Sequence, residues 1–273
     1  MLADGVAAPS SKAPRRVRQD RSTGPPKLTR RVGEKATARP RDRRGGAGSD
    51  PDPNRTLSEL AYRELRRRII FQDFKGGQAL DEMSAARALR LGRTPVREAI
   101  QMLARDGLVK VYARRGTFVS EMGLEVLRQV CETRAPIEEH VARRAALRAE
   151  AADIGKMRGA LAGVNALIDQ RLFRNLVEAD ERFHLALAEA AKNPLLQELV
   201  VKLHGLAIRF WYPTLTQRSL DDIREEMALH QHVLAAVEDH DPDKAAQAML
   251  TLVGGFFHRV TEVLKGTPPG ATA

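Results

Sequence analysis

Apolar side chains begin to recur at helical spacing near Thr56 and continue to about residue 70, which predicts a first helix. A short helix over 82–90 follows. A third is predicted from Thr94, a suitable N-cap, with Pro95 at the first helical position, and it ends at Gly107. The predicted core face of the first helix comprises Leu57, Leu60, Ala61, Leu65 and Ile69; that of the third comprises Val96, Ile100 and Leu103.

The spacing then changes from helical to alternating. Residues 108–112 and 117–120 have the pattern of two short strands, and Arg114, Arg115 and Gly116 supply the turn between them. Three helices followed by a hairpin predict a winged helix-turn-helix domain over residues 56–121.

From residue 122 the pattern is helical almost throughout, and Asn193-Pro194 and Asp241-Pro242 interrupt it. The sequence therefore predicts a mainly α protein whose second domain, residues 122–265, is an antiparallel all-helical bundle. Residues 1–55 are rich in Pro, Gly and Arg and are predicted to be a disordered basic tail. Residues 266–273 are also predicted to be a disordered tail. The expected bundle helices lie near 123–148, 150–170, 173–191, 195–211, 219–239 and 242–265.

The net charge of +10 is unevenly distributed. It is +8 over residues 1–55, +5 over 56–121 and −3 over 122–273, which favours a polyanionic partner for the N-terminal half. Cys131 is the only cysteine, so an intrachain disulfide is impossible, and no apolar run approaches the ~18 residues of a membrane helix. We expect a reduced, cytoplasmic setting and no membrane partner.

A cluster of polar residues suits the reading of DNA. A recognition helix places its first turn in the major groove, and arginine matches the edge of guanine. The alternative is that these arginines form a solvated helix face with no role in DNA binding. The predicted DNA-binding residues are Arg93, Thr94, Arg97 and Gln101 on the third helix, and Arg114, Arg115 and Gly116 at the turn of the hairpin.

In the bundle, Arg134, Asp180, His184 and His230 lie on otherwise apolar helix faces. Burying such groups is costly unless they meet each other, a metal or a ligand, so they predict a polar, effector-binding cavity. Asp180 and His184 are four residues apart and, with His230, match a three-ligand site for Zn²⁺ or a similar divalent ion. A buried Asp–His pair beside a second satisfied histidine is the alternative.

Residues 80–100, followed by Leu-Ala-Arg-Asp-Gly-Leu-Val at 103–109 and Arg-Gly-Thr-Phe-Val at 115–119, resemble the GntR family of bacterial regulators. The resemblance covers 57–121 and implies DNA contacts by Arg93, Thr94, Arg97 and Gly116. Two positions depart from the family pattern. Met83 stands where an arginine that contacts DNA is usual, and Gly92 replaces a usual Ser or Thr, so a different operator sequence is expected.

The run from Asp180 to Leu196 looks like the FCD sensor domain of the FadR subgroup, as do Arg134…Glu138 and residues 230–249. This resemblance implies a metal held by Asp180, His184 and His230 with a fourth histidine, and a small carboxylate effector held by the metal and an arginine. The fourth histidine is expected at 252, where this chain has Leu252. His258 is six residues further along, about 240° around the helix.

These features predict a transcriptional regulator whose binding to DNA responds to a small organic acid. A repressor is the leading expectation, and an activator is the alternative that the sequence leaves open. We expect a homodimer on a palindromic operator. Two alternatives differ in class: a metal-dependent enzyme acting on a small carboxylate, and a DNA-binding protein whose sensor domain is vestigial and ligand-free.

Overall fold

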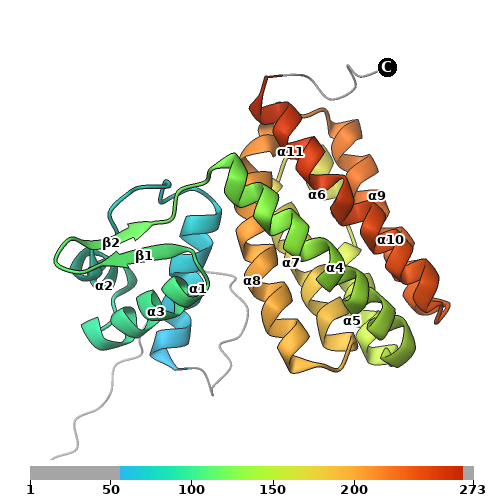
Figure 1. The fold of residues 1–273 in the computed structure, drawn as a ribbon, viewed down its shortest axis with the longest axis horizontal. Helices are drawn as coiled ribbons and strands as arrows, with labels where there is room; N and C mark the ends of the chain where they lie inside the picture. The colour runs from blue at the N-terminus through green and yellow to red at the C-terminus, as the bar shows by residue number, and fades with distance from the viewer. Residues whose placement is uncertain (1–55, 267–273) are drawn as a thin grey trace, which may run out of the picture. The chain divides into compact units, whose positions relative to one another are not determined.

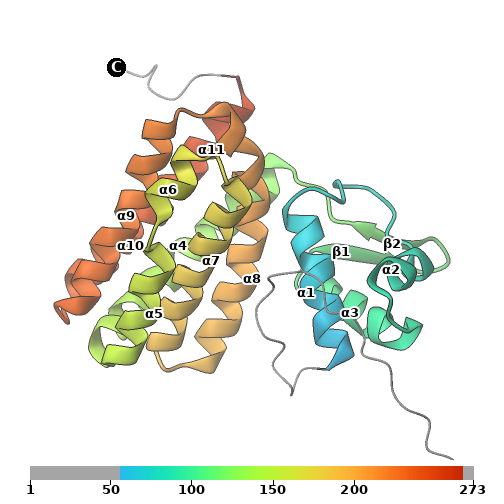
Figure 2. The ribbon, with the colours of Figure 1, turned by 180° about the vertical axis from the view of Figure 1, so that it is seen from behind.

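The structure is a computed structural model, and it describes residues 56–266. The predicted tails at 1–55 and 267–273 lie outside the described residues. The fold class is confirmed: a small domain of three helices and a two-stranded hairpin precedes an all-helical domain (Figures 1 and 2). Within the described residues, no helix combines the length and the apolar character that crossing a membrane requires.

The N-terminal domain is a winged helix-turn-helix. Its helices are α1 (Leu57–Ile70), α2 (Glu82–Leu89) and α3 (Arg93–Arg105), and its hairpin consists of β1 (Val109–Tyr112) and β2 (Gly116–Val119). The strands are antiparallel, with Val109 opposite Val119. Thr56 and Glu59 form a capping box at the start of α1. The core is built from the apolar faces of these elements, including Ala61, Leu65, Ile69, Val96, Leu103 and Val119.

Two local expectations for this domain were wrong. Helix α3 begins at Arg93, and its N-cap is Gly92, which makes no side-chain cap. Pro95 is thus the third helical residue, which is tolerated because the first-turn N–H groups have no helical acceptor. Leu57 and Leu60, assigned to the core face of α1, are 55% and 41% exposed, since they lie in the first turn, beyond the reach of the other core helices.

The C-terminal domain is a helical bundle. Figures 1 and 2 show α4, α7, α8, α9 and α10 side by side, and α4 packs against α7, α8 and α10. Its elements are α4 (Leu124–Arg148), α5 (Ala151–Leu161), α6 (Val164–Asp169), α7 (Phe173–Ala190), α8 (Pro194–Trp211), a 3-10 helix (Tyr212–Gln217), α9 (Leu220–Glu238), α10 (Pro242–Gly254) and α11 (Phe256–Leu264).

The bundle contains breaks that the helical pattern did not predict. The expected helix at 150–170 is divided between α5 and α6, because Gly163 adopts a left-handed conformation (φ 74°) that other residues rarely reach. The expected helix at 242–265 ends at Gly254 and resumes at Phe256. The 3-10 helix after α8 was not predicted. These interruptions matter because Trp211, Leu252, Phe256 and Arg259 all lie beside them and line one cavity.

Candidate functional sites

The first candidate site is the exposed side of α3, which we call the reading face and define as Arg93, Thr94, Arg97 and Gln101. All four residues are exposed, whereas Val96, Ile100 and Leu103 of the same helix are buried. This division follows from the helical period: buried and exposed residues occupy opposite sides of α3. The reading face therefore offers two guanidinium groups, a hydroxyl and an amide to a ligand outside the protein.

Both arginines of the reading face contact α2. Arg97 forms an ion pair with Glu82 (Nη2 to Oε1, 2.8 Å), which is exposed enough for solvent to weaken it. Arg93 Nη2 lies 3.2 Å from the Sδ atom of Met83. Residue 83, where the family pattern has an arginine, thus lies directly beside the reading face. In this chain it offers Arg93 a thioether in place of a second guanidinium.

The wing is the hairpin tip, residues 113–116, and its predicted DNA-binding residues are all exposed. Arg114 has φ 63° and Gly116 has φ 97°, so the tip needs left-handed backbone at both positions. The guanidinium of Arg115 lies over the ring of Tyr112, 5.9 Å from its centroid. The turn therefore carries two arginines on an exposed, tightly bent loop.

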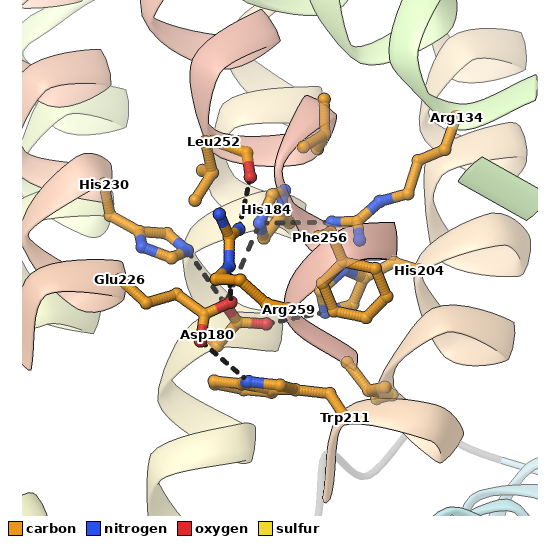
Figure 3. A pocket seen from close by; sticks show the side chains of 12 residues that line it. Arg134, Asp180, His184, His204, Trp211, Glu226, His230, Leu252, Phe256 and Arg259 are labelled. Carbon is orange, nitrogen blue, oxygen red and sulfur yellow. Dashed lines mark hydrogen bonds and ion pairs between the residues drawn. The ribbon is translucent and has the colours of Figure 1, made fainter. Parts of the chain in front are cut away.

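The second candidate site is a polar cavity inside the bundle. The four predicted residues Arg134, Asp180, His184 and His230 are at most 5% exposed, and all four line this cavity (Figure 3). Its volume is ≈ 20 Å³, enough for a single water molecule or ion. The other lining residues are His204, Ile208, Trp211, Glu226, Leu252, Val253, Phe256 and Arg259.

Asp180 is the centre of the polar cavity. His230 Nε2 lies 2.8 Å from its Oδ1, His204 Nε2 lies 3.0 Å from its Oδ2, and His184 Nε2 lies 3.9 Å from Oδ1. Burial alone would raise the pKa of the Asp180 carboxyl, but the hydrogen bonds from His204 and His230 hold that pKa well below its usual range. Three imidazoles from three helices thus surround one ionised carboxylate.

Arg134 and Glu138 form a fully buried ion pair one turn apart on α4. Burial would lower the pKa of Arg134, but the charge of Glu138 raises it. Burial would likewise raise the pKa of Glu138, and Arg134 and His184 lower it. Both groups are therefore charged. Arg134 Nη2 also lies 3.0 Å from His204 Nδ1 and 3.4 Å from His184 Nε2.

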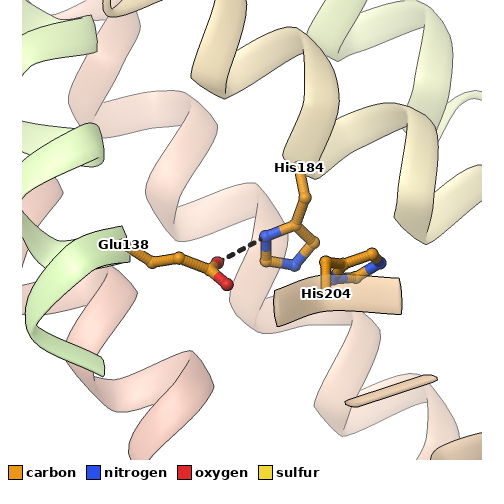
Figure 4. A group of neighbouring side chains, drawn as sticks. All are labelled: Glu138, His184 and His204. Carbon is orange, nitrogen blue, oxygen red and sulfur yellow. Dashed lines mark ion pairs between the residues drawn. The ribbon is translucent and has the colours of Figure 1, made fainter. Parts of the chain in front are cut away.

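His184 contacts carboxylates through both ring nitrogens. Its Nδ1 lies 2.7 Å from Glu138 Oε2 (Figure 4), so we assign the proton to Nδ1 and a lone pair to Nε2, the atom that faces Asp180. Burial lowers the pKa of His184 to about 4. The ring is therefore neutral at pH 7, the form that binds metal ions.

A second buried charge cluster closes one side of the cavity. Glu226 accepts hydrogen bonds from Trp211 Nε1 (3.1 Å), Arg218 and Arg259 Nε (3.0 Å). Arg259 Nη2 also donates to the carbonyl of Leu252 (2.7 Å). Glu226 and Arg259 line both the polar cavity and a neighbouring outer cavity of ≈ 250 Å³, so this ion pair separates the two.

Sequence reasoning missed several cavity residues as members of the site. Glu138 entered only as part of a motif, although its spacing from Arg134 already indicated an ion pair. His204 shares a helix face of α8 with Val200, Ile208 and Trp211, so its burial was detectable from periodicity. Glu226 likewise shares a face of α9 with Ile223, His230 and Val233, so its burial was detectable too. Its pairing with Arg259 was not, because it depends on how α9 and α11 meet.

A metal ion fits the donors of the polar cavity. The ligand atoms of Asp180, His184 and His230 lie within 4.8 Å of one another, and a second group of Glu138, His184 and His204 meets the same limit. Nδ1 of His230 is buried and has no hydrogen-bond partner among the described residues. One carboxylate with neutral imidazoles is the donor set that zinc and similar ions take.

A winged helix-turn-helix domain with an exposed, arginine-bearing helix, joined to a bundle with a charged interior, is typical of DNA-binding transcriptional regulators with a sensor domain. Comparison with known families agrees. Residues 57–119 match the model of bacterial regulatory proteins of the gntR family, and residues 129–254 match the FCD domain. The chain belongs to the GntR family of transcriptional regulators and carries an FCD domain.

Individual relatives are distant. The chain is 28% identical to the HTH-type transcriptional repressor RspR of Escherichia coli over 72% of this chain and 86% of that protein. It is 26% identical to the galactonate operon transcriptional repressor of Escherichia coli over 73% of this chain and 94% of the relative. A solved structure of E. coli McbR/YncC shares the fold, with a TM-score of 0.68 and 18% identity over 77% of this chain and 98% of that one.

Proposed function

We propose that this regulator is a cytoplasmic, homodimeric repressor that binds a palindromic operator and responds to a small carboxylate in its bundle. The observation that carries this proposal is the pairing of an exposed basic reading face with a buried cavity that holds Arg134, Asp180 and three histidines. Two relatives are named as repressors, which favours repression as the direction. A dimer would present two winged domains to the two half-sites of a palindrome.

In the proposed complex, the reading face enters the major groove. Arg97 reaches a guanine edge, and it must first leave Glu82, an exchange that costs little because the pair is exposed. Arg93 and Thr94 contact phosphate or base at the first turn of α3, and Gln101 lies one turn further along. Arg114, Arg115 and Gly116 bring the wing to the adjacent backbone or minor groove.

In the bundle, Asp180, His184 and His230 would hold a divalent ion such as Zn²⁺. That ion would supply a Lewis-acidic centre with open positions for a carboxylate. Arg134 is the candidate for the other side of the effector, because it is the cavity cation beside the histidines. Its present partners are Glu138 and the histidines, so effector binding requires Arg134 to exchange part of that contact.

The size of the cavity adds a second requirement. An organic acid needs several times the ≈ 20 Å³ now available, whereas the outer cavity of ≈ 250 Å³ is large enough. Glu226 and Arg259 line both cavities. We therefore propose that this ion pair is the partition that opens when effector enters, which gives the ligand a conformational change to drive.

Coupling to DNA follows if the effector favours one arrangement of the two winged domains in the dimer. Catalysis is not part of the proposal, because the matched family consists of transcriptional regulators.

The experiment combines elemental analysis of purified protein with a thermal-shift screen of small organic acids, with and without Zn²⁺. We expect one divalent ion per chain and stabilisation by at least one carboxylate. At a free ligand concentration 100 times Kd, stabilisation is about 2.7 kcal/mol. His184→Ala should lose both responses, whereas His232→Ala, an exposed histidine on α9, should keep them. Absence of metal together with identical responses of wild type and His184→Ala would contradict the metal-assisted sensor.

A further inference from the structure

We propose that His204 of α8 is the fourth protein ligand of the metal site and replaces the histidine that the family pattern places at residue 252. This inference rests on the proposed metal-assisted sensor, and it concerns a residue that neither the family motif nor the periodicity analysis assigned to the site. Leu252 is buried and lines the cavity with an apolar side chain, so it leaves the site one donor short.

The geometry around Asp180 supports His204. The three Nε2 atoms of His184, His204 and His230 all lie within 3.9 Å of an oxygen of Asp180. They come from α7, α8 and α9 and approach the carboxylate from different sides (Figure 3). His204 shares one group of possible ligands with His184 and Glu138, whereas Asp180, His184 and His230 form the other. His184 belongs to both groups, so His204 would join the second by a shift of its ring around Asp180, whose Oδ2 it already contacts at 3.0 Å.

His204 is buried inside the charged cluster. It is 2% exposed and its ring is stacked near that of His184, with centroids 4.5 Å apart. Nδ1 of His204 accepts from Arg134, and Nε2 faces Asp180. His204 thus bridges the cavity's cation to its central anion.

Ligation by His204 would alter Arg134. To offer a lone pair at Nε2, the neutral ring must carry its proton on Nδ1, the atom that now accepts from Arg134 Nη2. His184 Nε2, which lies 3.4 Å from the same Nη2, would be engaged as well. Arg134 would then lose two acceptors and turn an N–H group toward the cavity. His204 thereby links occupation of the metal site to readiness for a carboxylate.

The charges around the cavity favour an anion beside the ion. Arg134 is paired with Glu138, and Glu226 is shared by Arg218 and Arg259. A divalent ion at Asp180 would add two positive charges to this cluster, and a carboxylate effector would offset part of them. The site therefore suits an anionic group at its open position.

The test uses full-length, metal-stripped protein and titrates Co²⁺ and Zn²⁺ against a competing chelator. His204→Gln is the decisive variant, because glutamine can accept from Arg134 and donate to Asp180 but lacks the imidazole ligand. We expect His204→Gln to weaken metal affinity at least about tenfold and to change the visible Co²⁺ spectrum, while the melting temperature of the metal-free protein stays close to that of wild type. His232→Gln on the exposed side of α9 is the matched control and should equal wild type.

Leu252→His provides a second readout that leaves His204 in place. If His204 already fills the fourth position, this substitution should change affinity less than about threefold in wild type but restore most of the loss in His204→Gln. Wild-type affinity and spectrum in His204→Gln, or a gain above about tenfold from Leu252→His alone, would overturn the inference and leave Asp180, His184 and His230 as the site. No metal binding by wild type would overturn it together with the metal in the proposed function, whereas operator binding is measured separately.

Discussion

The reading face and the polar cavity use the same kinds of residue under opposite conditions. Arg97 is 64% exposed at its side chain and pairs with a carboxylate that solvent also reaches. Arg134 is 5% exposed and its carboxylate partner 1%. Solvent screens the first pair and leaves the second at full strength. Residues of the reading face can therefore change with little effect on folding, whereas removing one partner of the buried pair leaves the other unpaired and destabilises the bundle.

Arg134→Ala tests the buried side of this comparison and should have the largest effect. The substitution leaves Glu138 buried and charged without its cation, so we expect a loss of about 3–5 kcal/mol in the free energy of unfolding. Urea denaturation followed by circular dichroism measures it. Arg128→Ala removes an exposed arginine of the same helix and should cost less than about 1 kcal/mol. Equal small losses in both variants would show that the buried pair does not stabilise the bundle.

Arg97→Ala tests the opposite side of the comparison. We expect a loss of about 1–3 kcal/mol in affinity for the selected operator and a change in unfolding free energy within about 0.5 kcal/mol. Binding to operator and to random DNA at several salt concentrations provides the measurement. Arg105→Ala, at the other end of α3 and also exposed, should weaken both DNAs alike. A specificity ratio unchanged by Arg97→Ala would exclude Arg97 from base reading.

The sequence predicted the reading face more completely than the cavity. The positions of Arg97 and Gln101 follow from one helical period, so one helix was enough to place them. His204 and Arg259 enter the cavity because α8 and α11 meet α7 and α9 there, which periodicity along one helix cannot show. The start of α3 was misplaced because Thr94 is the better capping residue, yet the helix begins at Arg93, and its N-cap, Gly92, provides no side-chain cap.

Gly255→Ala separates stability from ligand binding inside the bundle. A Cβ atom at this position would lie 2.2 Å from Arg259 Nη1, so the guanidinium must swing away from the partition. Moving Arg259 weakens its pair with Glu226, which keeps Arg218 as a partner, and alanine favours helix by up to about 1 kcal/mol. We therefore expect a net loss of stability smaller than that of Arg134→Ala. Because the partition would already be open, carboxylate affinity should rise, as isothermal titration can measure. Weaker binding would mean that Arg259 holds the effector instead.

Met83→Arg is expected to have the smallest effect. Met83 is 49% exposed beside Arg93, so an arginine there can reach a phosphate. We predict a modest rise in affinity for all DNA sequences, and a slope of log affinity against log salt that is steeper by about 0.9. Leu124→Arg, at an exposed position of α4, adds the same charge in the bundle. A steeper slope in that control alone would count against the docking geometry.

Operator binding with and without ligand tests the central claim most directly. Operator is first selected from randomised DNA, and its affinity is then measured by fluorescence anisotropy with Zn²⁺, alone and with the carboxylate that gives the largest thermal shift. We predict that the carboxylate lowers operator affinity of wild type by about 1–3 kcal/mol and does not lower that of Arg134→Lys, which keeps the charge but lacks the planar fork. Operator affinity that stays constant while the carboxylate occupies the bundle would contradict the account.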